Sequence, residues 1–158
     1  MTEKPQTVVI PKEQAVFWLD KNGWWRNAAG KFRKKKIIDY FHKSIGRDEN
    51  GYFLIHDKGE KWEKIYFPYE DTALFVFDIR EDKQENGDMV LILNTGGKIP
   101  LVPENLWIQN DSLYITWENE KIKFAERALI KISKFITEDE NGRLAIKTGG
   151  RFRVISEK

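Results

Sequence analysis

The sequence contains no cysteine and only two histidines, His42 and His56. The lack of cysteine excludes disulfides, cysteine-ligated zinc and thiol chemistry, and it fits a reducing compartment. With two histidines an all-histidine metal site is unfavourable, and we expect neither a metal nor a cofactor. The chain also lacks an apolar run of the ~20 residues that span a bilayer. Its first twelve residues do not have the pattern of a secretory signal. We therefore expect a soluble, cytoplasmic protein.

Excess charge of one sign is also missing. The chain has 27 Lys and Arg against 25 Asp and Glu, which leaves a net charge of +2. This is too little for the broad positive field that non-specific nucleic-acid binders use, so any anion must be recognised by a local patch. What the sequence does have is aromatic residues, at 13% with six tryptophans, within a hydrophobic fraction of 41%. That composition is typical of a globular protein with a substantial core.

One short phrase, Asp-Glu-Asn-Gly, occurs twice, at residues 48–51 and 139–142. Each copy follows a pattern of apolar residues typical of a helix, over residues 37–45 and 125–136, and precedes a strand pattern. We predict that the phrase forms the turn from helix to strand in two similar halves.

Each half is predicted to contain an antiparallel three-strand meander, one helix and a β-hairpin. This order is typical of the α+β class, with helices packed on antiparallel sheets. We place the N-terminal half at residues 1–71 and the C-terminal half at residues 72–158. Residues 73–102 add strands to the second half only, joined by a turn at Asn86-Gly87. Residues 1–12 are predicted to be an arm of the first half.

Several short motifs along the chain resemble those of the bacterial domain of unknown function family 1285. They are Gly30-Lys31-Phe32 before Ile37-Ile38-Asp39-Tyr40-Phe41, Glu60-Lys61 before a strand, Glu70-Asp71-Thr72-Ala73-Leu74-Phe75, and the order of elements from Leu113 to Val154. The resemblance covers nearly the whole chain. It implies a duplicated α+β core with a C-terminal half similar to pleckstrin-homology-like barrels. It further implies a pocket between the halves for a nucleotide-like ligand in signalling.

The chain departs from the family pattern at two places. Residues 57–59 read Asp-Lys-Gly where the family tends to have Thr-Pro, and Lys34 stands where the family often has arginine. Lysine lacks the bidentate fork of arginine, so the phosphate geometry that the family implies does not carry over directly to Lys34.

Four consecutive cations, residues 33–36, stand immediately before the first predicted helix. Cations there oppose the helix dipole, whereas an anion would be favoured and would meet the free N–H groups of the helix end. The alternative is a solvated run of charge in a loop, where salt screens the unfavourable interaction. Lys34 is the candidate phosphate contact in this run.

The stretch from His56 to Trp62 is predicted to be the loop of a hairpin. His56 and Asp57 do not suit general acid–base catalysis, because neighbours on a strand point to opposite faces. Lys61 would bind a phosphate or pair with Glu60, and Trp62 would stack on a base. The alternative is a polar hairpin tip with weak surface ion pairs.

Glu70 and Asp71 lie at the predicted junction of the halves. Their carboxylates would accept hydrogen bonds from a ribose or a base edge, or would cap backbone N–H groups of the corner. Arg26 is a further candidate phosphate contact. The Thr-Gly-Gly-cation units at residues 95–98 and 148–151 predict hairpin turns rather than phosphate loops. The five other tryptophans lie in strand patterns, and we expect most of them in the core.

The leading hypothesis is a non-catalytic module that binds a phosphate-bearing, nucleotide-like ligand between its halves. The ligand-binding residues would be Arg26, Lys34, Lys61, Trp62, Glu70 and Asp71. The alternative is a protein-interaction module that docks a partner through its pleckstrin-homology-like half or through an exposed strand edge at residues 8–10. An enzyme is disfavoured, because the sequence offers no set of nucleophile, base and orienting group.

Overall fold

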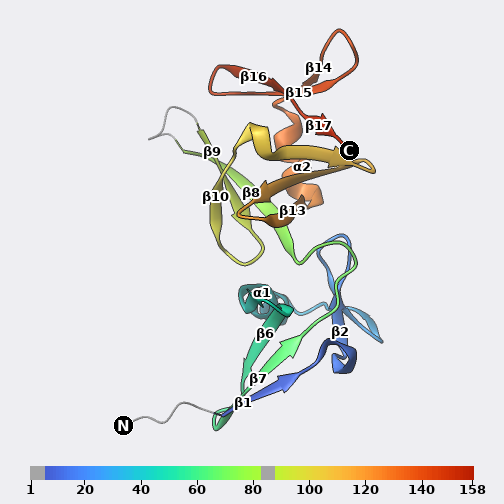
Figure 1. Ribbon diagram of the computed structural model, residues 1–158, viewed down its shortest axis with the longest axis vertical. Helices are drawn as coiled ribbons and strands as arrows, with labels where there is room; N and C mark the ends of the chain where they lie inside the picture. The colour runs from blue at the N-terminus through green and yellow to red at the C-terminus, as the bar shows by residue number, and fades with distance from the viewer. Residues whose placement is uncertain (1–5, 83–87) are drawn as a thin grey trace. The chain divides into compact units, whose positions relative to one another are not determined.

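The computed structural model describes residues 6–82 and 88–158, which form an α+β protein that is mostly strand with two α-helices (Figure 1). The chain divides into two compact units, Met1–Ala73 and Leu74–Lys158, here called the first and second unit. In the part of the chain that is described, neither helix is long and apolar enough to cross a lipid bilayer. The turn predicted at Asn86-Gly87 lies outside the described residues.

The first unit consists of two small sheets and one helix. Its strands are β1 (Gln6–Ile10), β2 (Phe17–Leu19), β3 (Trp25–Asn27), β4 (Gly30–Lys31), β5 (Ile45–Asp48), β6 (Gly51–Asp57) and β7 (Lys61–Tyr66), with a 3-10 turn η1 (Lys12–Gln14) and helix α1 (Lys35–Lys43). One sheet has the order β2-β3-β4 and the other β1-β7-β6-β5. The predicted meander, helix and hairpin are therefore present in this unit.

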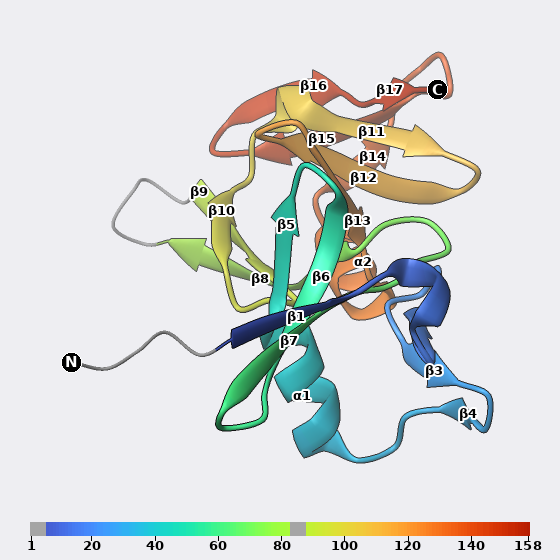
Figure 2. The ribbon, with the colours of Figure 1, turned by 60° about the horizontal axis from the view of Figure 1, so that its bottom comes forward.

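Strand β1 lies at the edge of the four-stranded sheet, parallel to β7, with Val8 opposite Glu63 (Figure 2). The edge strand predicted at residues 8–10 is confirmed and begins two residues earlier. Residues 1–5 of the predicted arm lie outside the described residues. The parallel pairing was not predicted, because a parallel partner is brought in over a long loop and leaves no local turn signal.

Aromatic rings form the core of the first unit. Trp25, which is 1% exposed, packs edge-on against Phe41 at 5.3 Å and Phe67 at 5.0 Å between ring centroids. Phe17 lies 5.0 Å from Phe41 in the same cluster. The helix thus faces the β2-β3-β4 sheet through its last turn. Ile37, the first residue of the apolar pattern that predicts this helix, is 43% exposed, and α1 begins two residues before it.

The second unit contains a seven-stranded sheet, a three-stranded sheet and one helix. Its elements are β8 (Leu74–Asp82), β9 (Asp88–Leu93), β10 (Lys98–Pro100), η3 (Pro103–Asn105), β11 (Leu106–Gln109), β12 (Ser112–Trp117), β13 (Glu120–Phe124), α2 (Glu126–Ser133), β14 (Ile136–Glu138), β15 (Leu144–Thr148), β16 (Arg151–Val154) and β17 (Ser156–Glu157). The sheet orders are β10-β9-β8-β13-β12-β11-β17 and β14-β15-β16.

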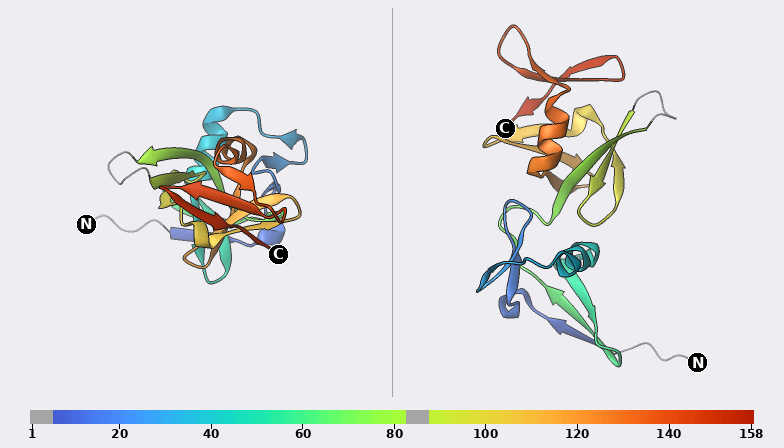
Figure 3. Two further views of the ribbon diagram at one scale, coloured as in Figure 1. Left: turned by 90° about the horizontal axis from the view of Figure 1, so that it is seen from above. Right: turned by 180° about the vertical axis from the view of Figure 1, so that it is seen from behind.

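Helix α2 packs on the second unit's larger sheet (Figure 3), and Ala128 and Ile132 from the helix join its buried cluster. Strand β8, which begins with the apolar run Leu74–Phe77, lies inside this sheet, as such a run predicts. The sheet is mixed, because β8 pairs in parallel with β13 and β11 pairs in parallel with β17. The expectation of purely antiparallel sheets is therefore wrong.

Both helices end earlier than predicted, and the repeated Asp-Glu-Asn-Gly phrase joins two strands rather than a helix and a strand. The isoleucine after each helix pairs in a sheet, Ile45 with Leu54 and Ile136 with Ile146. A β-branched residue fits such a pairing better than a helix end. In each phrase the aspartate side chain accepts the backbone N–H two residues later, from Asn50 and from Asn141.

Hairpin turns are found at both Thr-Gly-Gly units, as predicted. Gly149 and Gly150 both have positive φ, of 55° and 77°, which suits the two-residue turn between β15 and β16. Each unit also contains a three-strand meander followed by a helix and further strands, three in the first unit and four in the second. The meander is a separate sheet in the first unit, whereas in the second unit it is part of the seven-stranded sheet.

Candidate functional site

The small β2-β3-β4 sheet of the first unit has one buried face and one accessible face. Period-two alternation sends Phe17, Leu19 and Trp25 into the core, where each is at most 7% exposed. The residues between them lie on the opposite face, where Trp18 on β2 stands opposite Arg26 on β3. Lys31 on β4 stands opposite the same arginine. An indole, a guanidinium and an ammonium thus form one row across three strands.

A second tryptophan extends this row. Trp24 lies just before β3 and is 46% exposed, and the Lys31 Nζ atom lies 4.2 Å from the centroid of its ring. We call the surface formed by Trp18, Trp24, Arg26 and Lys31 the Trp-Arg face. The exposed ring of Trp24 and the half-buried ring of Trp18 lie beside two cations. Aromatic rings of this kind stack on planar ligands, and the cations contact phosphates.

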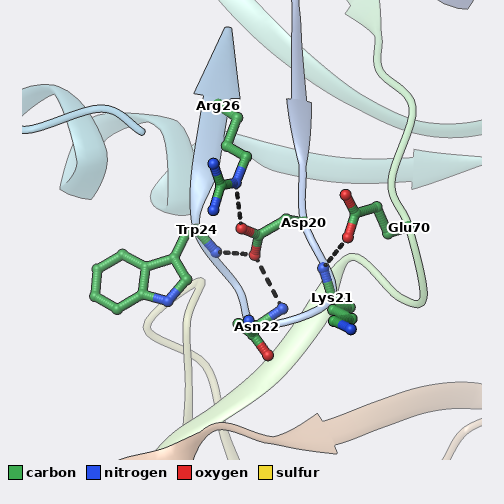
Figure 4. Close-up of polar contacts among 6 residues, drawn as sticks. All are labelled: Asp20, Lys21, Asn22, Trp24, Arg26 and Glu70. Atoms are coloured by element: carbon green, nitrogen blue, oxygen red, sulfur yellow. Dashed lines mark hydrogen bonds and ion pairs between the residues drawn. The ribbon is translucent and has the colours of Figure 1, made fainter. Parts of the chain in front are cut away.

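Asp20 organises the loop that carries this face (Figure 4). Its carboxylate is 3% exposed and accepts hydrogen bonds from the backbone N–H groups of Asn22 and Trp24, both at 2.9 Å through Oδ1. The other oxygen, Oδ2, accepts from Nε of Arg26 at 2.6 Å. A buried carboxylate with three donors fixes both the turn before β3 and the direction of the arginine side chain.

This arrangement leaves the far end of Arg26 unused. Within the described residues, the bond from Nε to Asp20 is the only hydrogen bond or ion pair of the side chain. Figure 4 draws one contact between the guanidinium and Asp20, from Nε, and none from either terminal nitrogen. The side chain is 37% exposed, so these nitrogens can form a fork for an anion.

Glu70 has a structural role at the same loop. Its Oε2 accepts the backbone N–H of Lys21 at 2.9 Å, and its own N–H donates to the carbonyl of Leu19. This is the capping role that was the alternative to ligand binding. Asp71, the next residue, is half-buried and already has a partner within the protein. Of the six predicted site residues, the structure brings together Arg26 and Glu70 through the Asp20 loop.

The predicted phosphate and stacking residues of the β6–β7 hairpin lie elsewhere. Lys61 and Trp62 begin β7, whereas Glu70 follows the other end of that strand. At about 3.3 Å per residue, the strand alone separates Lys61 from Tyr66 by roughly 17 Å. Both residues are exposed, with Trp62 at 39%. Strand β7 thus lies between the hairpin residues and Glu70, and their joint use by one ligand stays a prediction.

Lys34 is the N-cap residue of α1 and lies in the exposed run of residues 33–36. Its side chain does not cap the helix, and its carbonyl accepts from the backbone N–H groups of Ile37 and Ile38. This arrangement fits the solvated charge run that was the alternative interpretation.

Neither histidine has the setting of a catalytic base. His42 is 3% exposed and its Nδ1 accepts a hydrogen bond from the Trp25 indole at 3.2 Å. Burial lowers the pKa of His42 to about 4, against a smaller opposing effect of Asp39. His56 stands opposite Glu63 on β7, while the adjacent Asp57 accepts the N–H of Gly59 in the hairpin turn.

The described residues also include a pocket of about 470 Å³ in the second unit. Three carboxylates, those of Asp82, Asp88 and Glu104, line it together with Arg151. This balance of charge does not suit a phosphate. Among residues 6–82 and 88–158 there is also no group of three or more histidines and carboxylates placed to hold a metal ion.

Sequence reasoning missed Asp20, Trp18, Trp24 and Lys31. Alternation within residues 17–19 and 25–27 would have placed Trp18 on the face opposite Trp25, whereas no sequence signal marked Asp20. The sequence prediction assigns most strand tryptophans to the core and does not separate the two faces of the hairpin. The structure also makes Trp24 more exposed than Trp62, the predicted stacking residue.

Comparison with solved structures shows what this fold is similar to. A DUF1285 family protein from Silicibacter pomeroyi DSS-3 matches with a TM-score of 0.60 and 12% sequence identity, over 97% of this chain and 84% of that chain. A DUF1285 family protein from Shewanella baltica OS155 matches with a TM-score of 0.53 and 16% identity, over 78% of this chain and 94% of that chain. No protein-family model and no curated protein matches the sequence. The predicted resemblance to this family is thus confirmed, at the level of the fold.

Proposed function

We propose that the protein is a non-catalytic binding module whose Trp-Arg face receives a nucleotide-like ligand that carries phosphate. One observation carries the proposal: Asp20 engages only Nε of Arg26, so a positioned guanidinium keeps two terminal nitrogens for a ligand. A guanidinium held by a buried carboxylate is preorganised, and a ligand does not have to order it on binding.

The neighbouring residues define the rest of the ligand. Two phosphate oxygens would accept from the terminal nitrogens of Arg26 in a bidentate pair. Lys31, opposite Arg26 on β4, supplies a second positive charge. The exposed ring of Trp24 offers a surface on which a purine or pyrimidine would stack, which contributes about 1–3 kcal/mol per base in nucleic-acid complexes. Together, these residues favour a ligand in which a phosphate is attached to a planar ring over a ligand that has only the phosphate or only the ring.

Two broader expectations accompany this proposal. The family resemblance implies a role in signal transduction. A module without catalytic activity would act through the change that ligand binding causes in the protein. The shared order of meander, helix and strands in the two units supports the proposed duplication. The pleckstrin-homology-like nature of the second unit and a cytoplasmic location stay predictions.

A thermal-shift panel tests the proposal, with nucleoside mono-, di- and triphosphates compared against the matching nucleosides and against inorganic phosphate. A ligand at about 100 times its Kd adds roughly 2.7 kcal/mol of stability, which raises the melting temperature of a protein of this size by several degrees. We expect shifts with nucleotides, and weaker or no shifts with nucleosides and phosphate.

Two tryptophan variants locate the site. Trp24→Ala and Trp62→Ala remove exposed indoles of similar accessibility, 46% and 39%, from different sheets of the first unit. Loss of the nucleotide shift in Trp24→Ala, with retention in Trp62→Ala, is the expected result. A flat panel, or loss in Trp62→Ala alone, would overturn the assignment of the Trp-Arg face.

A further inference from the structure

Strand β16, Arg151–Val154, lies at the edge of the three-stranded sheet β14-β15-β16 in the second unit, and all four residues are exposed (Figure 1). Phe152 is 57% exposed, the largest exposed fraction of any aromatic side chain in the described residues. Phenylalanine has no polar atom to hydrate. Its exposure on a strand edge therefore marks a surface suited to a partner.

The backbone of β16 is ready to pair on its outer side. The N–H of Ile155 donates to the carbonyl of Leu144 at 2.8 Å, which makes these two residues a hydrogen-bonded pair of the β15–β16 ladder. Bonded and non-bonded pairs alternate in an antiparallel ladder. Arg153 and Arg151 thus bond to β15, whereas the N–H and C=O groups of Phe152 and Val154 point away from it. Within the described residues no backbone partner occupies that side.

The side chains of β16 separate by face. Phe152 and Val154 lie on one face beside Lys147, which stands opposite Phe152 on β15. Arg151 and Arg153 lie on the other face, where Arg151 also lines the pocket that contains Asp82, Asp88 and Glu104. Arg153 pairs with Glu104 at 3.1 Å, but both side chains are well exposed, at 56% and 41%, and such pairs are readily exchanged.

We propose that the edge of β16 binds an extended acidic segment of a partner protein, which adds to the sheet as an antiparallel strand. Carboxylates of that segment would stand opposite the two arginines, and apolar residues would stand opposite Phe152 and Val154. The carboxylate opposite Arg153 would replace Glu104. Main-chain bonds provide affinity in this mode of recognition, and the alternating side chains provide specificity.

Charge also disfavours a second copy of the chain at this edge. In an antiparallel pair of β16 strands, the registers that set Phe152 opposite Phe152 or Val154 of the other copy place arginine opposite arginine. Like charges directly opposite each other destabilise strand pairing. The inference goes beyond the ligand site proposed above and does not rest on it, because β16 belongs to the second unit.

Fluorescence anisotropy with the full chain tests the proposal. The probe is a labelled, acetylated seven-residue peptide in which glutamate alternates with valine and phenylalanine. One control peptide has lysine in place of glutamate, and another carries N-methyl groups at the amides that would face β16. We expect micromolar binding of the acidic peptide that weakens with salt, and at least tenfold weaker binding of both controls. No binding of the acidic peptide up to about 1 mM, or equal binding of either control peptide, would overturn the proposal.

Protein variants separate charge from backbone pairing. Arg151→Glu with Arg153→Glu should weaken binding at least tenfold, while Lys98→Glu, a charge reversal on the edge strand β10, should leave it unchanged. Phe152→Pro and Phe152→Ala both lose the ring, but only the proline also loses the outward N–H, and an edge strand tolerates it there. Weaker binding by Phe152→Pro than by Phe152→Ala is expected. Equal binding by these two variants would refute strand addition. Self-association through β16 in sedimentation would refute the acidic partner as the occupant of this edge.

Discussion

The indole of Trp25 donates a hydrogen bond from Nε1 to Nδ1 of His42, over 3.2 Å in the core of the first unit. Nδ1 can accept only while it lacks a proton, so the bond requires the neutral imidazole. Burial disfavours the charged form as well and lowers the pKa of His42 to about 4. Because the folded pKa lies below the unfolded value of 6.5, stability is complete above pH 6.5 and is lost as the pH falls towards 4.

We therefore predict that the free energy of unfolding decreases by about 2 kcal/mol between pH 7 and pH 5 through His42 alone. Urea unfolding at a series of pH values measures it. His42→Gln keeps an acceptor for Trp25 and removes the titration, so its unfolding free energy should change much less over the same interval. An identical pH dependence in both proteins would show that His42 does not control it.

Asp48 should control a more acidic interval. Its carboxylate accepts from Lys64 and from the hydroxyl of Tyr66, and these bonds lower its pKa to about 2 from 3.8. The stabilisation is present above pH 3.8 and is lost as the pH falls to 2. Asp48→Asn should reduce the pH dependence of unfolding in that interval. Acid unfolding is followed by circular dichroism. An unchanged pH dependence of unfolding in the Asp48→Asn variant would count against the prediction.

Removal of the Asp20 carboxylate should destabilise the first unit strongly. Asp20→Ala leaves two backbone N–H groups and the Nε of Arg26 without their acceptor at a buried position, which costs about 2–4 kcal/mol. Asp57→Ala is the matched control, because this exposed aspartate accepts a single turn N–H from Gly59. Chemical denaturation of both variants gives the comparison. Equal, small losses in the two would contradict the organising role of Asp20.

Gly46 lies opposite Phe53, and a Cβ added there would come within 2.7 Å of the Phe53 ring. We predict that Gly46→Ala destabilises the protein by about 1–3 kcal/mol, because the ring must leave its contacts with Tyr66 and Lys64. In a double-mutant cycle, Gly46→Ala should cost much less stability when Phe53→Ala has already removed the ring. Gly97→Ala serves as the control, since its Cβ would meet Thr95 Oγ1 at 3.4 Å.

The two interpretations of the ligand site differ in which lysine they use. On the Trp-Arg face Lys31 is the second cation, whereas the sequence motifs pointed to Lys61. Both are exposed, so Lys31→Glu and Lys61→Glu should leave the fold intact. We expect nucleotide affinity to fall at least tenfold in Lys31→Glu and to stay within about twofold in Lys61→Glu, by isothermal titration. A loss of affinity in Lys61→Glu without a loss in Lys31→Glu would instead support the predicted site at the β6–β7 hairpin.

Local signals were sufficient for several elements of this fold. Asn22-Gly23 between two aromatic runs predicts the β2–β3 hairpin, and Gly23 has the positive φ of 84° that such a turn uses. The uninterrupted apolar run before Asp78 predicts an interior strand, and β8 is one. Pro11 after an apolar run predicts an edge strand that ends there. In each case the information lies within a few adjacent residues, because turn geometry and the pattern of apolar residues determine the local structure directly.

The candidate site required the tertiary structure. Lys61 and Glu70 are close in sequence, but strand β7 lies between them, so their spacing along the chain does not show whether they share a site. Asp20 resembles an ordinary turn aspartate until Arg26 and two backbone N–H groups converge on it in a buried position. The sequence by itself determined where the chain turns and which segments become strands. Only packing decided which tryptophan faces solvent and which carboxylate is buried, because burial depends on contacts between residues far apart in the chain.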